Sequence, residues 1–179
     1  GGEAIEPGIT TAEIDKIIYD FIVRHGARPN FLHLYGFPAT ACISVNDTVI
    51  HGIPSRDQKI RPGDIVSIDT GCKIDGFNGD NACTFACGKI DLEAQRLLDV
   101  TKESLHLGIA AAQAGARIGD IGHAVQSYVE ENGFSVGREY VGHGVGKELH
   151  EDPEVPNYGH AGRGQRLMPG MCIAIEPMT

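Results

Sequence analysis

The chain has 179 residues, and its 15 Lys and Arg against 24 Asp and Glu give a formal net charge of −9. A hydrophobic content of 41% is too high for a disordered chain, and no apolar stretch approaches the roughly 20 residues that span a bilayer. The acidic balance, without any cluster of Lys and Arg, argues against a nucleic-acid partner. We therefore expect one domain of ordinary size with no membrane or nucleic-acid partner.

Both termini indicate a piece of a longer chain. The sequence begins with Gly1-Gly2 rather than with an initiator Met, and it stops at Thr179 directly after an apolar run. We therefore expect truncation at both ends.

The first predicted helix begins after Thr10, which forms a capping box with Glu13. Apolar residues then repeat with helical spacing and define one apolar face: Ile14, Ile17, Ile18, Phe21 and Ile22. Gly26 is placed to end this helix as its C-cap.

The remaining elements complete an α+β pattern. Apolar stretches typical of strands lie at 41–50, 63–72, 77–87 and 171–176. Asp75-Gly76 predicts a hairpin between two of them. Further helices are predicted at about 92–113, after Asp91 as N-cap, and at about 118–132, before Gly133. Strands, then helices, then a strand again indicate an antiparallel sheet.

The five cysteines are odd in number and contain no paired C-x-x-C motif, which argues against a zinc–thiolate site. They are Cys42, Cys72, Cys83, Cys87 and Cys172. We expect reduced and mostly buried thiols, as in a cytoplasmic protein.

The chain also repeats itself at an offset of 107 residues. The pattern of helix 8–26 returns at 115–133, and that of strand 62–69 returns at 169–176. One offset that aligns both a helix and a strand predicts two related halves. The halves extend over about 8–90 and about 115–179, and the second is incomplete.

Each half carries a carboxylate at the end of an apolar strand, Asp69 in the first and Glu176 in the second. Two halves related by a pseudo-twofold axis would place both in one central site. Because side chains alternate along a strand, Ser67 and Asp69 share one face, while Val66 and Ile68 occupy the other and pack under a helix.

The predicted hairpin brings a third carboxylate, Asp80, to the face of Asp69. With a two-residue loop at Asp75-Gly76, Asp69 lies across from Ala82 and Asp80 is diagonal to it. A turn centred one residue earlier sets Asp69 directly against Asp80. In either register the carboxylates repel each other unless a cation lies between them, although an Asp that points to solvent fits the hairpin equally well.

Three histidines are candidates for chemistry. His143 lies between Gly142 and Gly144, which allow the backbone to approach a ligand closely, and neutral imidazole is a common metal ligand. His51 and His150 each begin a His-x-x-Pro sequence, one in each half. Two Asp, one Glu and one His suit two divalent ions of Mn, Fe, Co or Zn, because bridging carboxylates favour a dinuclear arrangement.

Together these residues resemble methionine aminopeptidase of the bacterial type I class. The likeness covers essentially the whole chain. The motifs that carry it are Asp69 with Asp80, Gly142-His143-Gly144, His150-Glu151-x-Pro153, Ile175-Glu176-Pro177-Met178, Ser44-Val45-Asn46-Asp47 and Val49-Ile50-His51-Gly52-Ile53-Pro54. Tyr35 and Asn78 depart from the family, since many members have His at both positions.

The resemblance implies the pita-bread fold, in which two pseudo-symmetric halves form a central antiparallel sheet covered by helices. The chain would then be a single metallopeptidase catalytic domain over 1–179 that lacks its C-terminal strands. It stops before the family's fifth ligand, a second Glu on a further strand.

The resemblance also implies roles for individual residues. The implied metal ligands are Asp69, Asp80, His143 and Glu176. His51 and His150 would contact the substrate near the scissile amide, His150 would stabilise the tetrahedral intermediate, and Glu176 would help to deprotonate the attacking water. The implied lining of the methionine pocket is Phe37, Cys42 and Leu149.

The implied function is removal of the N-terminal methionine from nascent or newly made proteins by metal-assisted hydrolysis of the first peptide bond. The expected enzyme is a cytoplasmic monomer that acts on peptide and nascent-protein N-termini, with the ribosome as a further partner. Two alternatives stay open: a proline-directed peptidase of the same fold, and a non-catalytic binding module that kept the fold.

Overall fold

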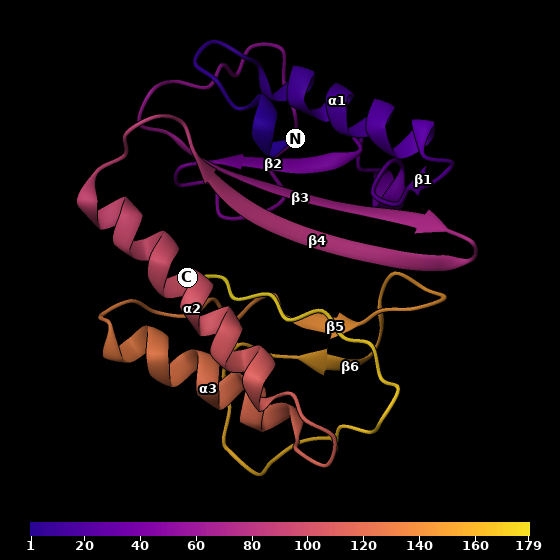
Figure 1. Cartoon of the computed structure of the whole chain (residues 1–179), viewed down its shortest axis with the longest axis vertical. Coiled ribbons are helices and arrows are strands. Elements are labelled where there is room, and N and C mark those ends of the chain that lie inside the picture. Colours follow the sequence, from indigo (N-terminus) through magenta and orange to yellow (C-terminus); the bar gives the residue numbers. More distant parts are fainter. The chain divides into compact units, whose positions relative to one another are not determined.

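The computed structural model describes residues 1–179, which divide into two compact units, Gly1–Ala94 and Gln95–Thr179. Figure 1 shows their helices and strands coloured along the chain. No helix combines the length and the apolar character that a membrane crossing requires.

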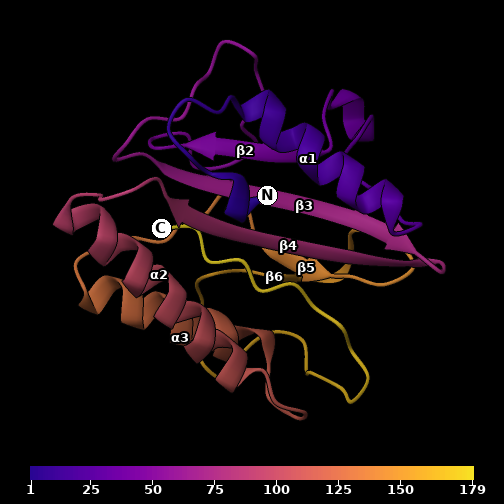
Figure 2. The ribbon, with the colours of Figure 1, turned by 45° about the horizontal axis from the view of Figure 1, so that its top comes forward.

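The first unit is built on an antiparallel sheet. Its elements are η1 (Gly2–Ala4), α1 (Thr11–Arg24), β1 (Arg28–Pro29), η2 (Leu34–Gly36), β2 (Ala41–Val45), β3 (Ile65–Ile74) and β4 (Phe77–Ala86). Strand β3 pairs with β1, β2 and β4. Because β4 pairs along the whole length of β3, β1 and β2 follow one another along its other edge, and Figure 2 shows α1 along this sheet.

The second unit contains α2 (Leu92–Ala111) from Gln95 onward. The start of this helix is capped as predicted, because Asp91 Oδ1 accepts the Ala94 N–H at 2.7 Å. Helix α3 (Ile118–Glu131) comes next, and then β5 (Gly142–Gly144) and β6 (Glu151–Val155), which pair antiparallel. Neither short strand was predicted.

The prediction of a strand at 171–176 is wrong, although the backbone of this segment is hydrogen-bonded to β5. An isolated bridge joins Gly144 and Ile173, and His143 and Ala174 exchange two backbone hydrogen bonds. The predicted strand at 41–50 is too long, because Asn46 takes a left-handed φ of 55° and ends β2 at Val45.

The capping box of α1 is present, with the Glu13 N–H donating to Thr10 Oγ1 and the Thr10 N–H donating to Glu13 Oε2. The helix ends at Arg24, and Gly26 follows with a φ of 76°. Its predicted apolar face is only partly buried: Ile17 and Phe21 are 42% and 56% exposed.

Each unit has its own apolar core. In the first, Ile14, Ile18 and Ile22 of α1 pack against the apolar face of β3, including Val66 and Ile68. In the second, Val100 of α2 packs with Val125 and Val129 of α3. Nearer the start of α3, Ile118 and Ile121 pack against Val155 of β6, with Ile173 and Ile175 beside them. The prediction that Val66 and Ile68 pack under a helix is therefore confirmed.

All five cysteines are free thiols, as predicted, but the expectation that most are buried is wrong. Cys42 and Cys87 are buried, whereas Cys83 and Cys172 are exposed.

Candidate functional site

Asp69 and Asp80 lie on the β3–β4 hairpin in the register of a two-residue loop. Asp69 pairs with Ala82 and Asp80 with Gly71, and the turn residues Asp75 and Gly76 both have left-handed φ angles of 50° and 84°. The first of the two predicted registers is therefore confirmed. The two carboxylates share one face as diagonal neighbours, for which a separation of roughly 7–8 Å is typical.

Cys42 lies on that face as well, because β2 pairs it directly with Asp69. Its side chain is 5% exposed. Burial raises the pKa of the Cys42 thiol to about 12, with further contributions from the negative charges of Asp69, Asp80 and Asp15. Cys42 is consequently a neutral, weakly polar wall and not a nucleophile.

Asp15 of α1 fixes the start of β2, a contact that the sequence did not reveal. Its Oδ1 accepts the backbone N–H groups of Thr40 and Ala41, both at 2.9 Å. Burial raises the pKa of Asp15, and these two hydrogen bonds oppose that shift. The helix thus sets the position of the strand that carries Cys42.

His51 is exposed on a loop that is held against β2. The Gly52 N–H donates to Ser44 Oγ at 3.0 Å, and the Gly52 carbonyl accepts the Ile43 N–H at 2.8 Å. A Cβ on Gly52 would lie 2.2 Å from the Ile43 carbonyl oxygen, so only glycine allows this approach. Phe37, another predicted residue of the first unit, follows η2 and is half-buried.

His143 lies at the centre of β5. The sequence predicted that the flanking glycines let the backbone approach a ligand, and in the structure they let other backbone segments approach. A Cβ on Gly142 would lie 2.3 Å from the Ala174 carbonyl oxygen, and one on Gly144 would lie 2.4 Å from that of Asp152. The ring Nδ1 lies 2.8 Å from the Gly144 carbonyl oxygen. Since that oxygen is an acceptor only, Nδ1 carries a proton, which leaves Nε2 as the nitrogen that presents a lone pair when the ring is neutral.

The side-chain carboxylate of Glu176 faces this lone pair. Its Oε1 lies 3.2 Å from His143 Nε2, and the same oxygen is buried without a hydrogen-bond partner. A carboxylate oxygen and an imidazole lone pair that face each other at this distance repel unless a proton or a cation lies between them. The pair therefore fits a divalent cation, for which carboxylate and imidazole are both suitable ligands.

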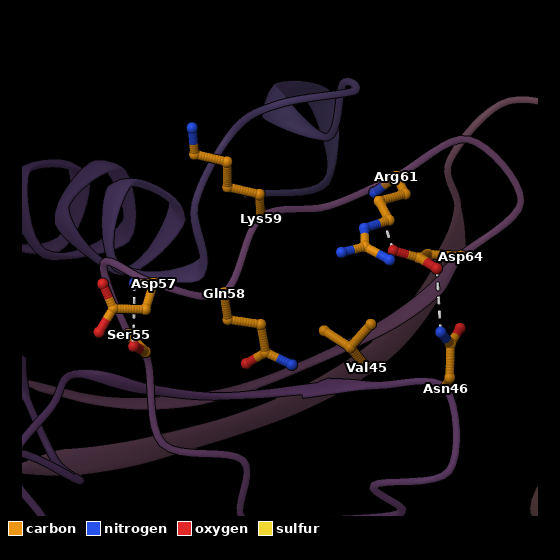
Figure 3. A pocket seen from close by; sticks show the side chains of 8 residues that line it. All are labelled: Val45, Asn46, Ser55, Asp57, Gln58, Lys59, Arg61 and Asp64. Carbon is orange, nitrogen blue, oxygen red and sulfur yellow. Dashed lines mark hydrogen bonds between the residues drawn. The ribbon is translucent and has the colours of Figure 1, made fainter.

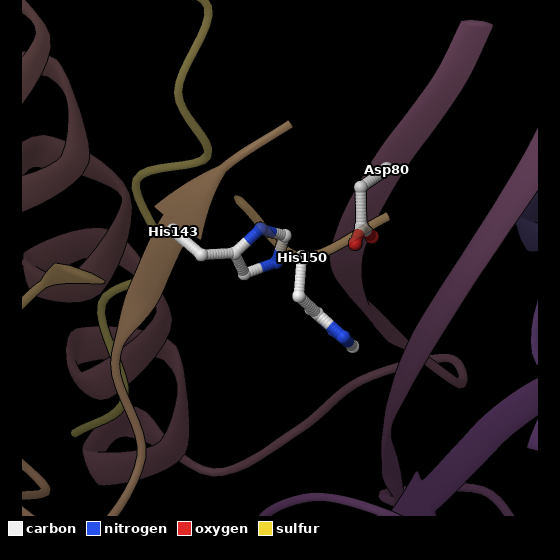
Figure 4. Close-up of side chains that lie close together, drawn as sticks. All are labelled: Asp80, His143 and His150. Atoms are coloured by element: carbon white, nitrogen blue, oxygen red, sulfur yellow. The ribbon is translucent and has the colours of Figure 1, made fainter. Parts of the chain in front are cut away.

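His150 lies beside His143 in the loop that precedes β6. The two rings are in T-shaped contact, with centroids 4.5 Å apart. Figure 4 shows both rings, together with the side chain of Asp80 on β4. His150 is exposed, as an acid–base or hydrogen-bonding group must be to reach a substrate, and Leu149 before it is half-buried.

The predicted residues thus come together within each unit. Asp69, Asp80 and Cys42 share one face of the first sheet, and His143, His150 and Glu176 form one cluster in the second unit. A buried amide in the second unit was missed: Asn157 Nδ2 donates to the Glu176 backbone carbonyl at 2.7 Å.

A separate polar pocket of about 560 Å³ lies in the first unit and contains none of the predicted site residues. Two acidic and two basic side chains line it, Asp57, Asp64, Lys59 and Arg61. Asp64 is already occupied, since it accepts from Asn46 Nδ2 and from the Arg61 N–H (Figure 3). This balance of charge gives the pocket no preference for one class of ligand.

Comparison with known proteins gives consistent results. The model of metallopeptidase family M24 matches residues 2–179. A methionine aminopeptidase of Clostridium acetobutylicum is 53% identical over 177 residues, which are 99% of this chain and 71% of that protein. The crystal structure of methionine aminopeptidase from Rickettsia prowazekii matches with a TM-score of 0.96 at 39% identity, covering 98% of this chain and 71% of that one.

A more distant likeness extends to a proline-directed peptidase. The prolidase from Pyrococcus horikoshii matches with a TM-score of 0.82 at 25% identity and covers 98% of this chain and 48% of that one.

Proposed function

Because the chain belongs to metallopeptidase family M24, we propose that it removes the N-terminal methionine from peptides and newly made proteins by metal-assisted hydrolysis of the first peptide bond. It is a hydrolase with the pita-bread fold and divalent metal cofactors, and its substrates are peptide and protein N-termini. The observation that carries the choice of substrate is the close identity, over nearly the full chain, to proteins named as methionine aminopeptidases.

We propose that two divalent ions are held by the ligands Asp69, Asp80, His143 and Glu176. The support is chemical: one face of the first sheet gathers two carboxylates, and the second unit sets an imidazole lone pair against a buried carboxylate oxygen. We further propose that a fifth ligand, a second Glu, lies beyond Thr179. The chain spans 71% of the length of its Clostridium acetobutylicum relative, which leaves room for such a strand.

The chemistry divides between the cofactor and the side chains. Bound divalent ions of this kind supply Lewis acidity, which activates a water molecule and polarises a carbonyl group. Glu176 accepts the proton of the attacking water. His150 donates a hydrogen bond to the developing oxyanion, a contribution of about 3–4 kcal/mol for comparable donors. His51 contacts the substrate near the scissile amide and orients it.

Phe37, Cys42 and Leu149 are the proposed lining of the methionine pocket. An apolar ring, a neutral thiol and an aliphatic side chain suit a thioether, because soft polarizable contacts favour methionine. The raised pKa of Cys42 supports this role, since a thiolate would not accept an apolar side chain. The free α-amine of the substrate would bind close to the acidic residues, and this would select chain ends.

We also propose the compartment, the oligomeric state and a partner of the enzyme. Newly made chains are the largest pool of N-terminal methionine, so we place the enzyme in the cytoplasm as a monomer that contacts the ribosome. Sedimentation with and without ribosomes tests the monomeric state and the ribosome contact, and a heavier free species would contradict the monomer.

The decisive experiment compares methionine release from Met-Ala-Ser with cleavage of Xaa-Pro peptides, using the protein at its full natural length. We expect Met-Ala-Ser to be the better substrate. His143→Ala and Asp80→Asn should lower kcat/KM by at least the roughly 10- to 100-fold that loss of a ligand's supporting residue costs. Unchanged turnover in either variant would refute the ligand assignment.

The same assay separates the two alternatives. Preference for Xaa-Pro peptides would establish a proline-directed peptidase. Metal binding without cleavage of either peptide would establish a non-catalytic module.

A further inference from the structure

The segment that carries Glu176 is anchored along its backbone at every second carbonyl. Three of these anchors are ordinary backbone hydrogen bonds, from Val145 to Cys172 at 3.1 Å, from His143 to Ala174 at 3.2 Å, and from Gly137 to Met178 at 2.7 Å. The first two follow the register of an antiparallel ladder alongside β5, whereas Gly137 lies before β5 and outside that register.

The carbonyl of Glu176 is the exception in this series. His143 and Ala174 face each other as a hydrogen-bonded pair, so a continued ladder would place Val141 opposite Glu176. The donor to this carbonyl is instead the side-chain amide of Asn157, at 2.7 Å. A side chain thus takes the place of a strand at the residue that bears the proposed ligand.

Asn157 is well suited to hold a fixed position. It lies two residues beyond the end of β6, at Val155, and is only 1% exposed. The backbone on both sides of it is pressed against α3, because a Cβ on Gly122 would lie 2.4 Å from the Tyr158 carbonyl oxygen and 2.7 Å from that of Pro156. The donor therefore has little freedom to move.

We infer that Asn157 is a positioning residue for Glu176. Its hydrogen bond fixes the peptide plane of Glu176 and with it the direction of the Cα–Cβ bond. That direction sets the carboxylate Oε1 3.2 Å from His143 Nε2, in the geometry that a shared cation requires. The inference rests on the proposed function, in which both side chains are metal ligands.

The test is Asn157→Asp in the protein at its full natural length, since Asp keeps the shape of Asn but cannot donate. We expect the Kd for Co²⁺, measured by calorimetry on metal-free protein, to rise roughly 10- to 100-fold, as is typical when a residue that orients a ligand is lost. The visible spectrum of bound Co²⁺ should change, and kcat for Met-Ala-Ser should fall more than KM rises.

Asn132→Asp is the matched control. Asn132 Nδ2 also donates to a backbone carbonyl, that of Tyr128 at 2.9 Å, at the end of α3. The same chemical change there should lower the Tm by less, because Asn132 is only half-buried, while the Co²⁺ affinity and spectrum stay as in the wild type.

Two further variants complete the experiment. Asn157→Leu keeps the branching of the side chain at Cγ and buries no charge, so it gives the same answer if the aspartate variant does not fold. In a Glu176→Gln background, the effect of Asn157→Leu on Co²⁺ affinity should disappear, because Asn157 acts through Glu176.

The outcomes are distinguishable. Wild-type Co²⁺ affinity and spectrum in the folded Asn157 variants would overturn the inference. An unchanged Co²⁺ affinity in Glu176→Gln alone would overturn the ligand assignment itself, and with it the premise for Asn157.

Discussion

At the scale of single residues, the half-buried carboxylate of Asp15 supports two buried backbone N–H groups. Asp15→Ala leaves the amides of Thr40 and Ala41 without this acceptor, and both residues are at most 1% exposed. An orphaned buried donor costs about 1–3 kcal/mol, so we expect a loss of that order in the free energy of unfolding, measured in urea. Asp15→Asn retains an acceptor oxygen and should lose less; equal losses would contradict this account.

The same residue predicts a dependence on pH. Burial raises the folded-state pKa of Asp15 above its unfolded value. Its contribution to stability is therefore fully present below the unfolded pKa and is lost as the pH rises through the folded pKa. The stability of the wild type relative to Asp15→Asn should fall as the pH rises above the unfolded-state pKa of about 4. A difference that is constant or rises with pH would show that the hydrogen bonds outweigh burial.

At the scale of elements, the close contact of α3 with the 156–164 loop depends on glycine, which has no side chain to hold the two segments apart. Replacement of a helical glycine by alanine ordinarily stabilises a helix by about 1 kcal/mol. At Gly122 the new Cβ would lie 2.4 Å from the Tyr158 carbonyl oxygen. We expect Gly122→Ala to destabilise the protein by about 1–3 kcal/mol through overpacking. Thermal unfolding measures the change, and Ser127→Ala, one turn further along α3, is the control; a higher Tm for Gly122→Ala would contradict the close approach.

Elements with a periodic signal were predictable, and those defined by contacts were not. The capping box of Thr10 and the turn at Asp75-Gly76 act locally, so the sequence predicts α1 and the hairpin correctly. Strand β5 has three residues, two of them glycine, and it exists because the glycines let other backbone segments approach. Such a strand has no periodicity to detect.

The residues of the site also fall into those that the sequence made predictable and those that it did not. The charged and ring side chains were recognisable by type and spacing, and the hairpin placed Asp69 and Asp80 on one face. The residues that hold them were not recognisable. Asn157 acts through one hydrogen bond and Asp15 through two, all to distant backbone groups, and in the sequence each resembles an ordinary polar residue of a loop or a helix.

At the scale of the whole molecule, metal binding should stabilise the fold. If Glu176 and His143 are metal ligands as proposed, a bound cation would lie between them in the folded chain only, and a ligand that binds the native state alone raises its stability by mass action. We expect chelator treatment to lower the Tm and added Co²⁺ to restore it. Glu176→Gln should respond less to both treatments, and an equal response would place the stabilising ion elsewhere.

The internal repeat is clearer in the backbone structure than in the types of side chain. Helices α1 and α3 have 14 residues each, and the bridge between Thr10 and Lys59 returns as one between Arg117 and Arg166. At the offset of 107 residues Thr10 corresponds to Arg117 and Lys59 to Arg166, so the side chains differ in both pairs, yet the bridged backbone positions correspond. The pattern is that of an ancient duplication in which main-chain geometry was inherited and the side chains were free to specialise. One copy came to carry paired aspartates on a hairpin, and the other a histidine opposite a glutamate.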